Sequence, residues 1–359
     1  MVAGALLAPA ADYLMYVGTY TGPASKGIYV YRFEPAIAKI TSLGLAAATE
    51  NPAYLAVRPD GDYLYAVNEV RDGRVSAFRI DRKSGKLASL NRVSSRGDGP
   101  CALSVDPSGK YVMAANYGSG SVALYPIQAD GSLGEASAFD QHTGTGADKK
   151  RQEGPHAHAA IFSPDGRFAL SADLGVDRIY VYRIDAAGKT LAAAAPGTVA
   201  PGSGPRHLAF HPSGKFAYSI NELTAAVTAF TWDAGTLTEI ETVPALPKDY
   251  QGAKSGAEIA VHPNGGFVYV SNRGAANNIA VFAVDPVKGT LTLVEHVASG
   301  GRTPRYIGFD PTGEYLLAAN QESNNIVFFR ADAKTGKLSA IGMPVRIAAP
   351  VCIKFAAAE

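Results

Sequence analysis

The chain has 359 residues, and 47% of them are hydrophobic, so it is long enough to bury a large core. Its 33 lysines and arginines nearly balance its 32 acidic residues, and the net charge of +1 argues against the broad basic surface typical of nucleic-acid binding. No apolar run approaches the length of a membrane-spanning helix. We therefore expect neither nucleic acid nor a membrane as a partner.

Residues 1–11 form a short stretch that ends in small residues and lacks a basic segment ahead of its apolar part. We interpret this stretch as a disordered terminus or as the remnant of an export signal. The protein is expected to be cytoplasmic, and periplasmic if the second interpretation holds. Residues 12–359 are expected to form a single domain, present as a monomer or a weak homo-oligomer.

Short strands and tight turns follow one another along the rest of the chain. The first two predicted strands are Tyr13–Gly18 and Gly27–Phe33. The next unit has four predicted strands, which are Ala53–Val57, Tyr63–Asn68, Arg74–Ile80 and Lys86–Val93. A Pro-x-Gly corner joins the first two strands of that unit, and it recurs about every 50 residues, which is the size of one propeller blade. The corner prolines are Pro59, Pro107, Pro164, Pro212, Pro263 and Pro311.

The two ends of the chain carry complementary halves of one further unit. The N-terminal unit lacks a first strand, and Ala349–Phe355 matches the first strand of the other units. We therefore predict an all-β, seven-bladed β-propeller of four-stranded antiparallel blades. Its ring is closed by pairing of Val351–Phe355 with the N-terminal blade, which leaves no long open edge.

Equivalent positions in the units separate residues needed by the fold from candidate functional residues. Nine residues after each corner proline stands an Asn or Asp, as in Asn68 and Asp173, so this position is interpreted as structural. The next position and the start of the first strand differ in chemistry from unit to unit. First strands are innermost in a propeller, so these polar side chains should converge on one mouth of the central channel. The candidates are His158, Arg206, Glu222, Arg273, Glu69, Glu258, Arg305 and His207.

His156 and His158 would face the same side if one strand extends through both. Such a pair can bind zinc, but no third ligand with equally clear spacing is visible, and we expect no metal and no cofactor. The remaining interpretations are a general base beside an arginine or a hydrogen-bonded structural pair. Arg206 is either an anion or oxyanion contact or a salt-bridge partner of Glu222 or Glu258 between blades.

Two other features are given structural interpretations. Cys101 and Cys352 fall on first strands of non-adjacent units, which favours two buried thiols and no disulfide. The basic run Lys149–Arg151 lies in a polar insertion at about residues 138–153, and we expect a solvated loop there.

Several motifs together resemble the seven-bladed β-propeller lactonase family, over essentially the whole chain. They are Gly18-Thr-Tyr-Thr21, Pro155-His-Ala-His158, Gly204-Pro-Arg-His207, Asn221-Glu222 and Asn272-Arg273-Gly274. The family includes 6-phosphogluconolactonases, and a fungal carboxymuconate lactonizing enzyme is related. The resemblance implies a metal-independent hydrolase of a small sugar lactone. It also implies that His158, with His156 beside it, and Arg206, Glu222 and Arg273 occupy the family's site positions.

The chemistry expected from these residues is attack of water on a lactone carbonyl. A neutral His158, or His156 in its place, would activate the water, and Arg206 would stabilise the oxyanion. Glu222 would orient one of these groups, and Arg273 or Arg305 would hold an anionic substrate tail. A lactonizing cycloisomerase and a non-catalytic binding scaffold are the alternatives.

Overall fold

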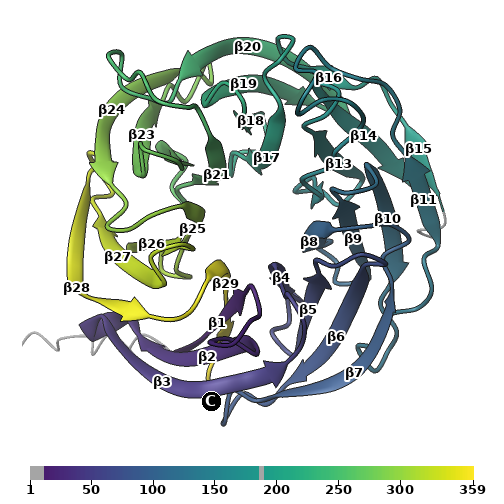
Figure 1. Cartoon of the computed structure of the whole chain (residues 1–359), viewed down its shortest axis with the longest axis vertical. Helices are drawn as coiled ribbons and strands as arrows, with labels where there is room; N and C mark the ends of the chain where they lie inside the picture. The colour runs from purple at the N-terminus through teal and green to yellow at the C-terminus, as the bar shows by residue number, and fades with distance from the viewer. Residues whose placement is uncertain (1–11, 186–189) are drawn as a thin grey trace, which may run out of the picture.

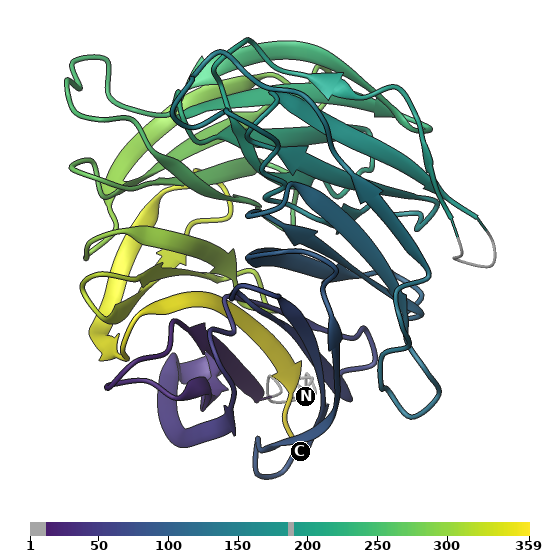
Figure 2. The same cartoon turned by 45° about the vertical axis from the view of Figure 1, so that its right-hand side comes forward.

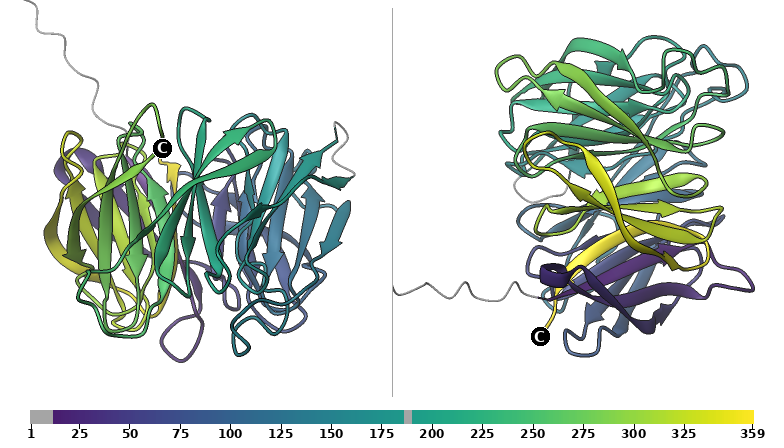
Figure 3. Two further views of the ribbon diagram at one scale, coloured as in Figure 1. Left: turned by 90° about the horizontal axis from the view of Figure 1, so that it is seen from above. Right: turned by 90° about the vertical axis from the view of Figure 1, so that its left-hand side faces the viewer.

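The computed structural model describes residues 12–185 and 190–359. The described residues form seven antiparallel sheets, and Figure 1 shows them as blades of a ring around a central channel. Seen edge-on, the strands run between the two faces of a disc (Figure 3). The predicted seven-bladed propeller is therefore confirmed. The interpretation given to residues 1–11 lies outside the described residues.

Each blade begins at the channel with an inner strand and continues outward to a second strand. The inner strands are β29 (Pro350–Ala357), β4 (Tyr54–Val57), β8 (Pro100–Val105), β12 (Ile161–Phe162), β17 (Pro205–Phe210), β21 (Gly256–Val261) and β25 (Pro304–Phe309). The second strands are β1 (Tyr13–Thr19), β5 (Tyr63–Asn68), β9 (Tyr111–Asn116), β13 (Phe168–Asp173), β18 (Phe216–Asn221), β22 (Phe267–Asn272) and β26 (Tyr315–Asn320).

Two further layers complete the blades. The third strands are β2 (Gly27–Glu34), β6 (Arg74–Ile80), β10 (Ser121–Pro126), β14 (Arg178–Ile184), β19 (Ala226–Asp233), β23 (Asn278–Val284) and β27 (Asn325–Ala331). The outer strands are β3 (Lys39–Ala48), β7 (Leu87–Ser94), β11 (Ala138–Gln141), β15 (Leu191–Ala193), β16 (Gly197–Thr198), β20 (Thr236–Pro244), β24 (Leu291–Ala298) and β28 (Leu338–Arg346). In the fourth blade the outer layer consists of two short strands, β15 and β16, both paired with β14. A short 3₁₀ helix, η1 (Pro35–Ile37), joins β2 to β3.

The ring closes where the two ends of the chain meet. β29 pairs antiparallel with β1, with Met15 opposite Phe355 and Gly18 opposite Cys352. In Figures 1 and 2 the yellow C-terminal strand lies beside the purple N-terminal strands. The predicted closure is confirmed, and the first blade is held together by residues more than 300 positions apart in the sequence.

The six Pro-x-Gly corners have a common backbone geometry. Their glycines, from Gly61 to Gly313, have φ angles between 68° and 77°, in the left-handed region that side chains with a Cβ disfavour. The preceding proline fixes its own φ near the value that the turn needs. The repeat seen in the sequence therefore has a conformational cause.

Tyrosines on the second strands tie neighbouring blades together. The hydroxyl of Tyr65 donates to Gly131 O at 2.9 Å, and that of Tyr269 donates to Gly336 O at 2.8 Å. Both acceptors lie in the outer hairpin of the following blade. These buried hydrogen bonds fix how adjacent blades sit, and thereby position the inner strands around the channel.

Two structural interpretations from the sequence are also confirmed. At the ends of the second strands, Asn116 donates to Ser95 O at 2.9 Å, and Asp173 accepts from the backbone N–H of His156 at 2.7 Å. Cys101 and Cys352 are free and buried, and the β4–β7 blade separates their blades.

Within residues 12–185 and 190–359 no helix is long and apolar enough to cross a membrane.

Candidate active site

One mouth of the channel contains a polar cavity of about 220 Å³. All seven blades contribute to it, mostly from the start of an inner strand or from the residue that follows a second strand, and Arg151 and His158 come from the segment ahead of β12. The lining residues are Tyr20, Glu69, Cys101, Tyr117, Arg151, His158, Glu222, Arg273 and Arg305. Five predicted site residues, Glu69, His158, Glu222, Arg273 and Arg305, are thus brought together.

Glu222 is the centre of this cavity's charge network. Its Oε2 lies 2.8 Å from Arg273 Nη2 and 3.0 Å from Arg206 Nε, and its Oε1 accepts from Arg151 Nη2 at 2.6 Å. Burial would raise the pKa of Glu222, but the guanidinium groups of Arg273 and Arg206 outweigh it and lower the pKa to about 2. The carboxylate therefore stays ionised and holds three cations in place.

Arg206 lies behind Glu222, away from the cavity surface. It is 1% exposed, and its Nη1 donates to Ala257 O of the next blade at 2.5 Å. Its Nε contacts Glu222 at 3.0 Å without the alignment of a hydrogen bond. Burial, followed by the charges of Arg273 and Arg305, lowers the pKa of Arg206 to about 10, so it is still a cation at neutral pH. Arg206 pairs with Glu222, as one of the two interpretations from the sequence has it, but the two residues belong to one blade and not to neighbouring blades.

The two histidines of the His-Ala-His motif both contact the Tyr117 ring, His156 in a stacked and His158 in an edge-on arrangement. His158 is 4% exposed, and its Nδ1 has no hydrogen-bond partner among the described residues. His156 stacks on the Tyr117 ring at 4.5 Å, and its Nε2 lies 3.1 Å from Glu153 Oε1. No regular strand runs through both histidines, because β12 begins only at Ile161. Their different surroundings follow from this irregular backbone.

Burial gives His158 its protonation state. Burial first, then the charges of Arg206 and the nearby His207, lower the pKa of His158 well below its ordinary value. The imidazole is therefore neutral at pH 7, and the His158 side chain lines the cavity. A neutral imidazole beside a polar cavity has the form required of a general base.

A second charged pair lines the other side of the cavity. Tyr20 donates its hydroxyl to Glu69 Oε2 at 2.6 Å, and Arg305 Nη2 lies 3.8 Å from the same oxygen. The Arg305 guanidinium carbon also lies 5.4 Å from the centre of the Tyr20 ring. Tyr20, Glu69 and Arg305 come from three different blades, so this cluster connects those blades at the cavity.

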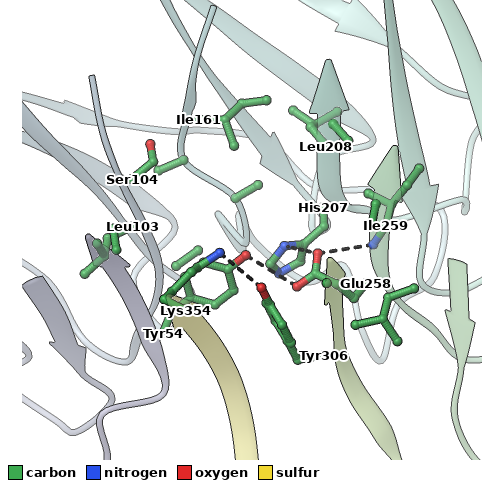
Figure 4. A pocket seen from close by; sticks show the side chains of 18 of the residues that line it. Tyr54, Leu103, Ser104, Ile161, His207, Leu208, Glu258, Ile259, Tyr306 and Lys354 are labelled. Carbon is green, nitrogen blue, oxygen red and sulfur yellow. Dashed lines mark hydrogen bonds and ion pairs between the residues drawn. The ribbon is translucent and has the colours of Figure 1, made fainter. Parts of the chain in front are cut away.

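His207 and Glu258 do not lie at this mouth, contrary to the expectation from the sequence. Each is the third residue of its inner strand, β17 or β21, whereas Arg206 and Arg305 are second residues, so His207 and Glu258 lie deeper in the channel. His207 Nδ1 donates to Glu258 Oε1 at 2.9 Å, and both line a separate cavity in the other half of the channel (Figure 4).

The interpretation of the basic run Lys149–Arg151 as a solvated loop is wrong for Arg151. Lys149 and Lys150 are exposed, but Arg151 reaches into the cavity and donates to Glu222 and, at 3.3 Å, to the Tyr117 hydroxyl. An insertion has no equivalent in the other blades, so the register of the repeat carried no signal for it.

Two tyrosines of the cavity were also not predicted as site residues, although their positions in the repeat match those of predicted site residues. Tyr20 and Tyr117 each follow the last residue of a second strand, as Glu69, Glu222 and Arg273 do. Extending the alignment to the N-terminal unit would have found Tyr20. Cys101 also lines the cavity, and burial raises the pKa of its thiol, so the group is neutral.

No group of three or more His, Cys, Asp or Glu side chains in the described ranges is arranged to hold a metal ion. The cavity is instead lined by one histidine and three arginines, which are His158, Arg151, Arg273 and Arg305. Such donors suit an anionic or oxygen-rich organic ligand.

The fold and site define a seven-bladed propeller with a cationic cavity at one mouth of its channel. The family described as "Lactonase, 7-bladed beta-propeller" matches residues 14–355. The chain therefore belongs to the seven-bladed β-propeller lactonase family, and the predicted enzyme class, a lactonase, is confirmed.

Relatives and solved structures agree with this assignment over nearly the whole chain. A Bacillus subtilis protein named 6-phosphogluconolactonase is 40% identical over 346 residues, covering 96% of this chain and 98% of the relative. A putative 6-phosphogluconolactonase of Bacteroides fragilis has a similar structure, with a TM-score of 0.90, 40% identity and coverage of 96% of this chain and 98% of that chain. The Pseudomonas aeruginosa periplasmic gluconolactonase gives a TM-score of 0.91 at 35% identity, covering 97% of this chain and all of that chain.

Proposed function

We propose that the protein hydrolyses a small, negatively charged sugar lactone, 6-phosphogluconolactone, to the open-chain acid in the cavity around Glu222. The observation that carries this proposal is the charge of the cavity. Arg151, Arg206, Arg273 and Arg305 lie in or directly behind it, against only two carboxylates, Glu69 and Glu222. The site therefore has two positive charges left over for a ligand, and relatives named for this activity support the choice of substrate.

The excess charge is divided between two parts of the cavity. Arg273 and Arg151 converge on Glu222, and Arg305 lies across from them beside Glu69. A substrate with a reacting carbonyl at one end and a phosphate at the other would meet a guanidinium at each end. Guanidinium groups suit phosphate and carboxylate because their N–H donors match the oxygen geometry.

His158 is proposed as the general base. Its buried, neutral imidazole can take a proton from a water molecule as the water oxygen bonds to the lactone carbonyl carbon. The ring C–O bond then breaks, and the proton passes from His158 to the departing alkoxide, which becomes a hydroxyl. The new carboxylic acid ionises at neutral pH, so each turnover consumes one water and releases one proton.

Arg273 is better placed than Arg206 to stabilise the oxyanion. Arg273 lines the cavity and its side chain is 15% exposed, whereas the Arg206 side chain is 2% exposed and lies behind Glu222. We therefore assign oxyanion stabilisation to Arg273, with Arg151 beside it, and a positioning role toward Glu222 to Arg206. Donors fixed before the reaction are effective because no reorganisation is needed when charge develops.

A proton-release assay tests the proposal directly. The assay compares 6-phosphogluconolactone with unphosphorylated gluconolactone at constant pH, with and without a chelator. We expect a higher kcat/KM for the phosphorylated lactone, and no effect of the chelator. A preference for gluconolactone would remove the phosphate assignment and leave the hydrolase standing. Activity lost on chelation and restored by added metal would contradict the proposed mechanism.

A further inference from the structure

The far half of the central channel contains a second cavity, of about 390 Å³, separate from the candidate active site. Figure 4 shows Tyr54, His207, Glu258, Tyr306 and Lys354 pointing into it from different inner strands. The two cavities come close together at His207, whose ring centre lies 5.1 Å from that of His158. The volume lies within the range of small-molecule sites.

Small residues keep this half of the channel open. At the same level of the inner strands stand Ala56, Ser104, Ala209, Ala260 and Gly308, all of which line the cavity. Gly308 makes room for Tyr306, because a Cβ at that position would lie 2.5 Å from the Tyr306 hydroxyl oxygen. The cavity thus exists because most side chains in this layer of the inner strands are small.

The two larger residues of that layer are Ile161 and Lys354, and Lys354 carries a charge. Its ammonium donates to the Tyr306 hydroxyl at 3.2 Å and lies 5.0 and 5.1 Å from the centres of the Tyr54 and Tyr306 rings. No carboxylate of the described residues lies within salt-bridge distance of Lys354. Among residues 12–185 and 190–359 it is also the only lysine or arginine that lines this cavity. An ammonium has three N–H donors, so at least two remain for a ligand or solvent.

Glu258, the carboxylate that lines this cavity, already accepts hydrogen bonds from its neighbours. Glu258 accepts from His207 Nδ1 at 2.9 Å, from the Ile259 backbone N–H at 3.2 Å and from the Tyr54 hydroxyl at 3.4 Å. Burial would raise the pKa of Glu258, but His207 and Arg206 outweigh it and lower the pKa. The carboxylate is therefore ionised, satisfied by its own donors and unavailable to Lys354 as a close partner.

We propose that this cavity is a second small-molecule site, which binds a short-chain monocarboxylate with its carboxylate on Lys354 Nζ. A single ammonium with spare donors matches one negative charge, whereas a phosphate dianion would lack a second cation here. Alanines and the partly exposed Ile161, Phe210 and Phe309 line the rest of the cavity and suit a short aliphatic tail. The site is independent of the lactone chemistry at the other mouth.

The test uses sodium butanoate as the probe and measures its dissociation constant by ligand-detected NMR with the full-length protein. We expect butanoate to bind, and 1-butanol, which has the same chain length without the charge, to bind at least tenfold more weakly. Lys354→Met should weaken butanoate binding at least tenfold, and Lys150→Met, the same change at an exposed lysine, should leave it unchanged. Equal butanoate binding by the wild type and Lys354→Met would overturn the proposal.

Two further variants separate this site from the candidate active site and guard against misfolding. Arg273→Met should leave butanoate binding unchanged, and loss of binding there but not in Lys354→Met would place the probe in the first cavity and overturn the proposal. Ala260→Leu should block the cavity while keeping Lys354. If Lys354→Met does not fold, as judged by circular dichroism, the second variant decides, because unchanged binding in Ala260→Leu would overturn the proposal.

Discussion

Arg206 Nε lies 3.0 Å from Glu222 Oε2, and the two side chains are only 2% and 7% exposed. Arg206 stands on β17 and Glu222 directly follows β18 of the same blade, so the pair is set by the pairing of two adjacent strands. The same carboxylate also binds Arg151 and Arg273. Glu222 therefore links one blade's internal ion pair to the cations that face the cavity.

The pH dependence of stability should report this network. The pKa of Glu222 is lowered from its ordinary 4.5 to about 2 in the folded protein, so the unfolded chain binds its proton first as the pH falls. The stabilisation, on the order of 3 kcal/mol, is present above about pH 4.5 and is lost as the pH falls toward 2. In Glu222→Gln this component should be missing and neutral-pH stability should be lower. Urea unfolding between pH 3 and pH 7 measures it, with exposed Glu135→Gln as the control. An identical pH dependence in Glu222→Gln and the wild type would contradict this prediction.

The rate profile should show where His158 titrates. The pKa of His158 lies well below 6.5, so the imidazole stays neutral and active as the pH falls through that value. We expect the low-pH limb of kcat/KM to lie below pH 6.5 and the activity of His158→Gln to fall by at least about 100-fold. His296→Gln, on the outer strand β24, is the control. Retained activity in His158→Gln would remove His158 from the mechanism.

Substitution of Arg151 should lower activity without lowering stability. Its side chain is 41% exposed, so Arg151→Met should leave the melting temperature nearly unchanged. Loss of a charged donor at the cavity should lower kcat/KM by about 10- to 100-fold. The matched substitution Lys150→Met, one residue away and exposed, should have no effect. Equal kcat/KM values in the two variants would contradict a role of Arg151 in the reaction.

Much of this molecule could be predicted from its sequence because the fold repeats. The corner Pro-x-Gly dictates a turn that any blade must make, so blade number, strand order and closure by β29 all followed from spacing. The same register identified Glu222 and Arg273 as unusual positions. It could not find Arg151, which lies in an insertion outside the repeat. It also could not resolve depth along the channel, and so His207 and Glu258 were expected one layer too close to the mouth.

Deletion of residues 349–359 tests the closure energetically. The deletion removes β29 and leaves β1 as an unpaired inner edge, so we expect loss of cooperative thermal unfolding of the entire ring. Removal of residues 358–359 alone, beyond β29, is the control and should shift the melting temperature by only a few degrees. A full truncation that melts like the wild type would contradict the role of β29.

The most direct test of the account is proton release from 6-phosphogluconolactone by Arg273→Met beside the wild type. Arg273 lines the cavity and bonds Glu222, and we assign it the developing oxyanion. Loss of one fixed donor of this kind costs about 100- to 1000-fold in rate. The account predicts a loss of that size in kcat/KM in a variant that still folds by circular dichroism. Undiminished hydrolysis by folded Arg273→Met would contradict the claim that lactone chemistry occurs in this cavity.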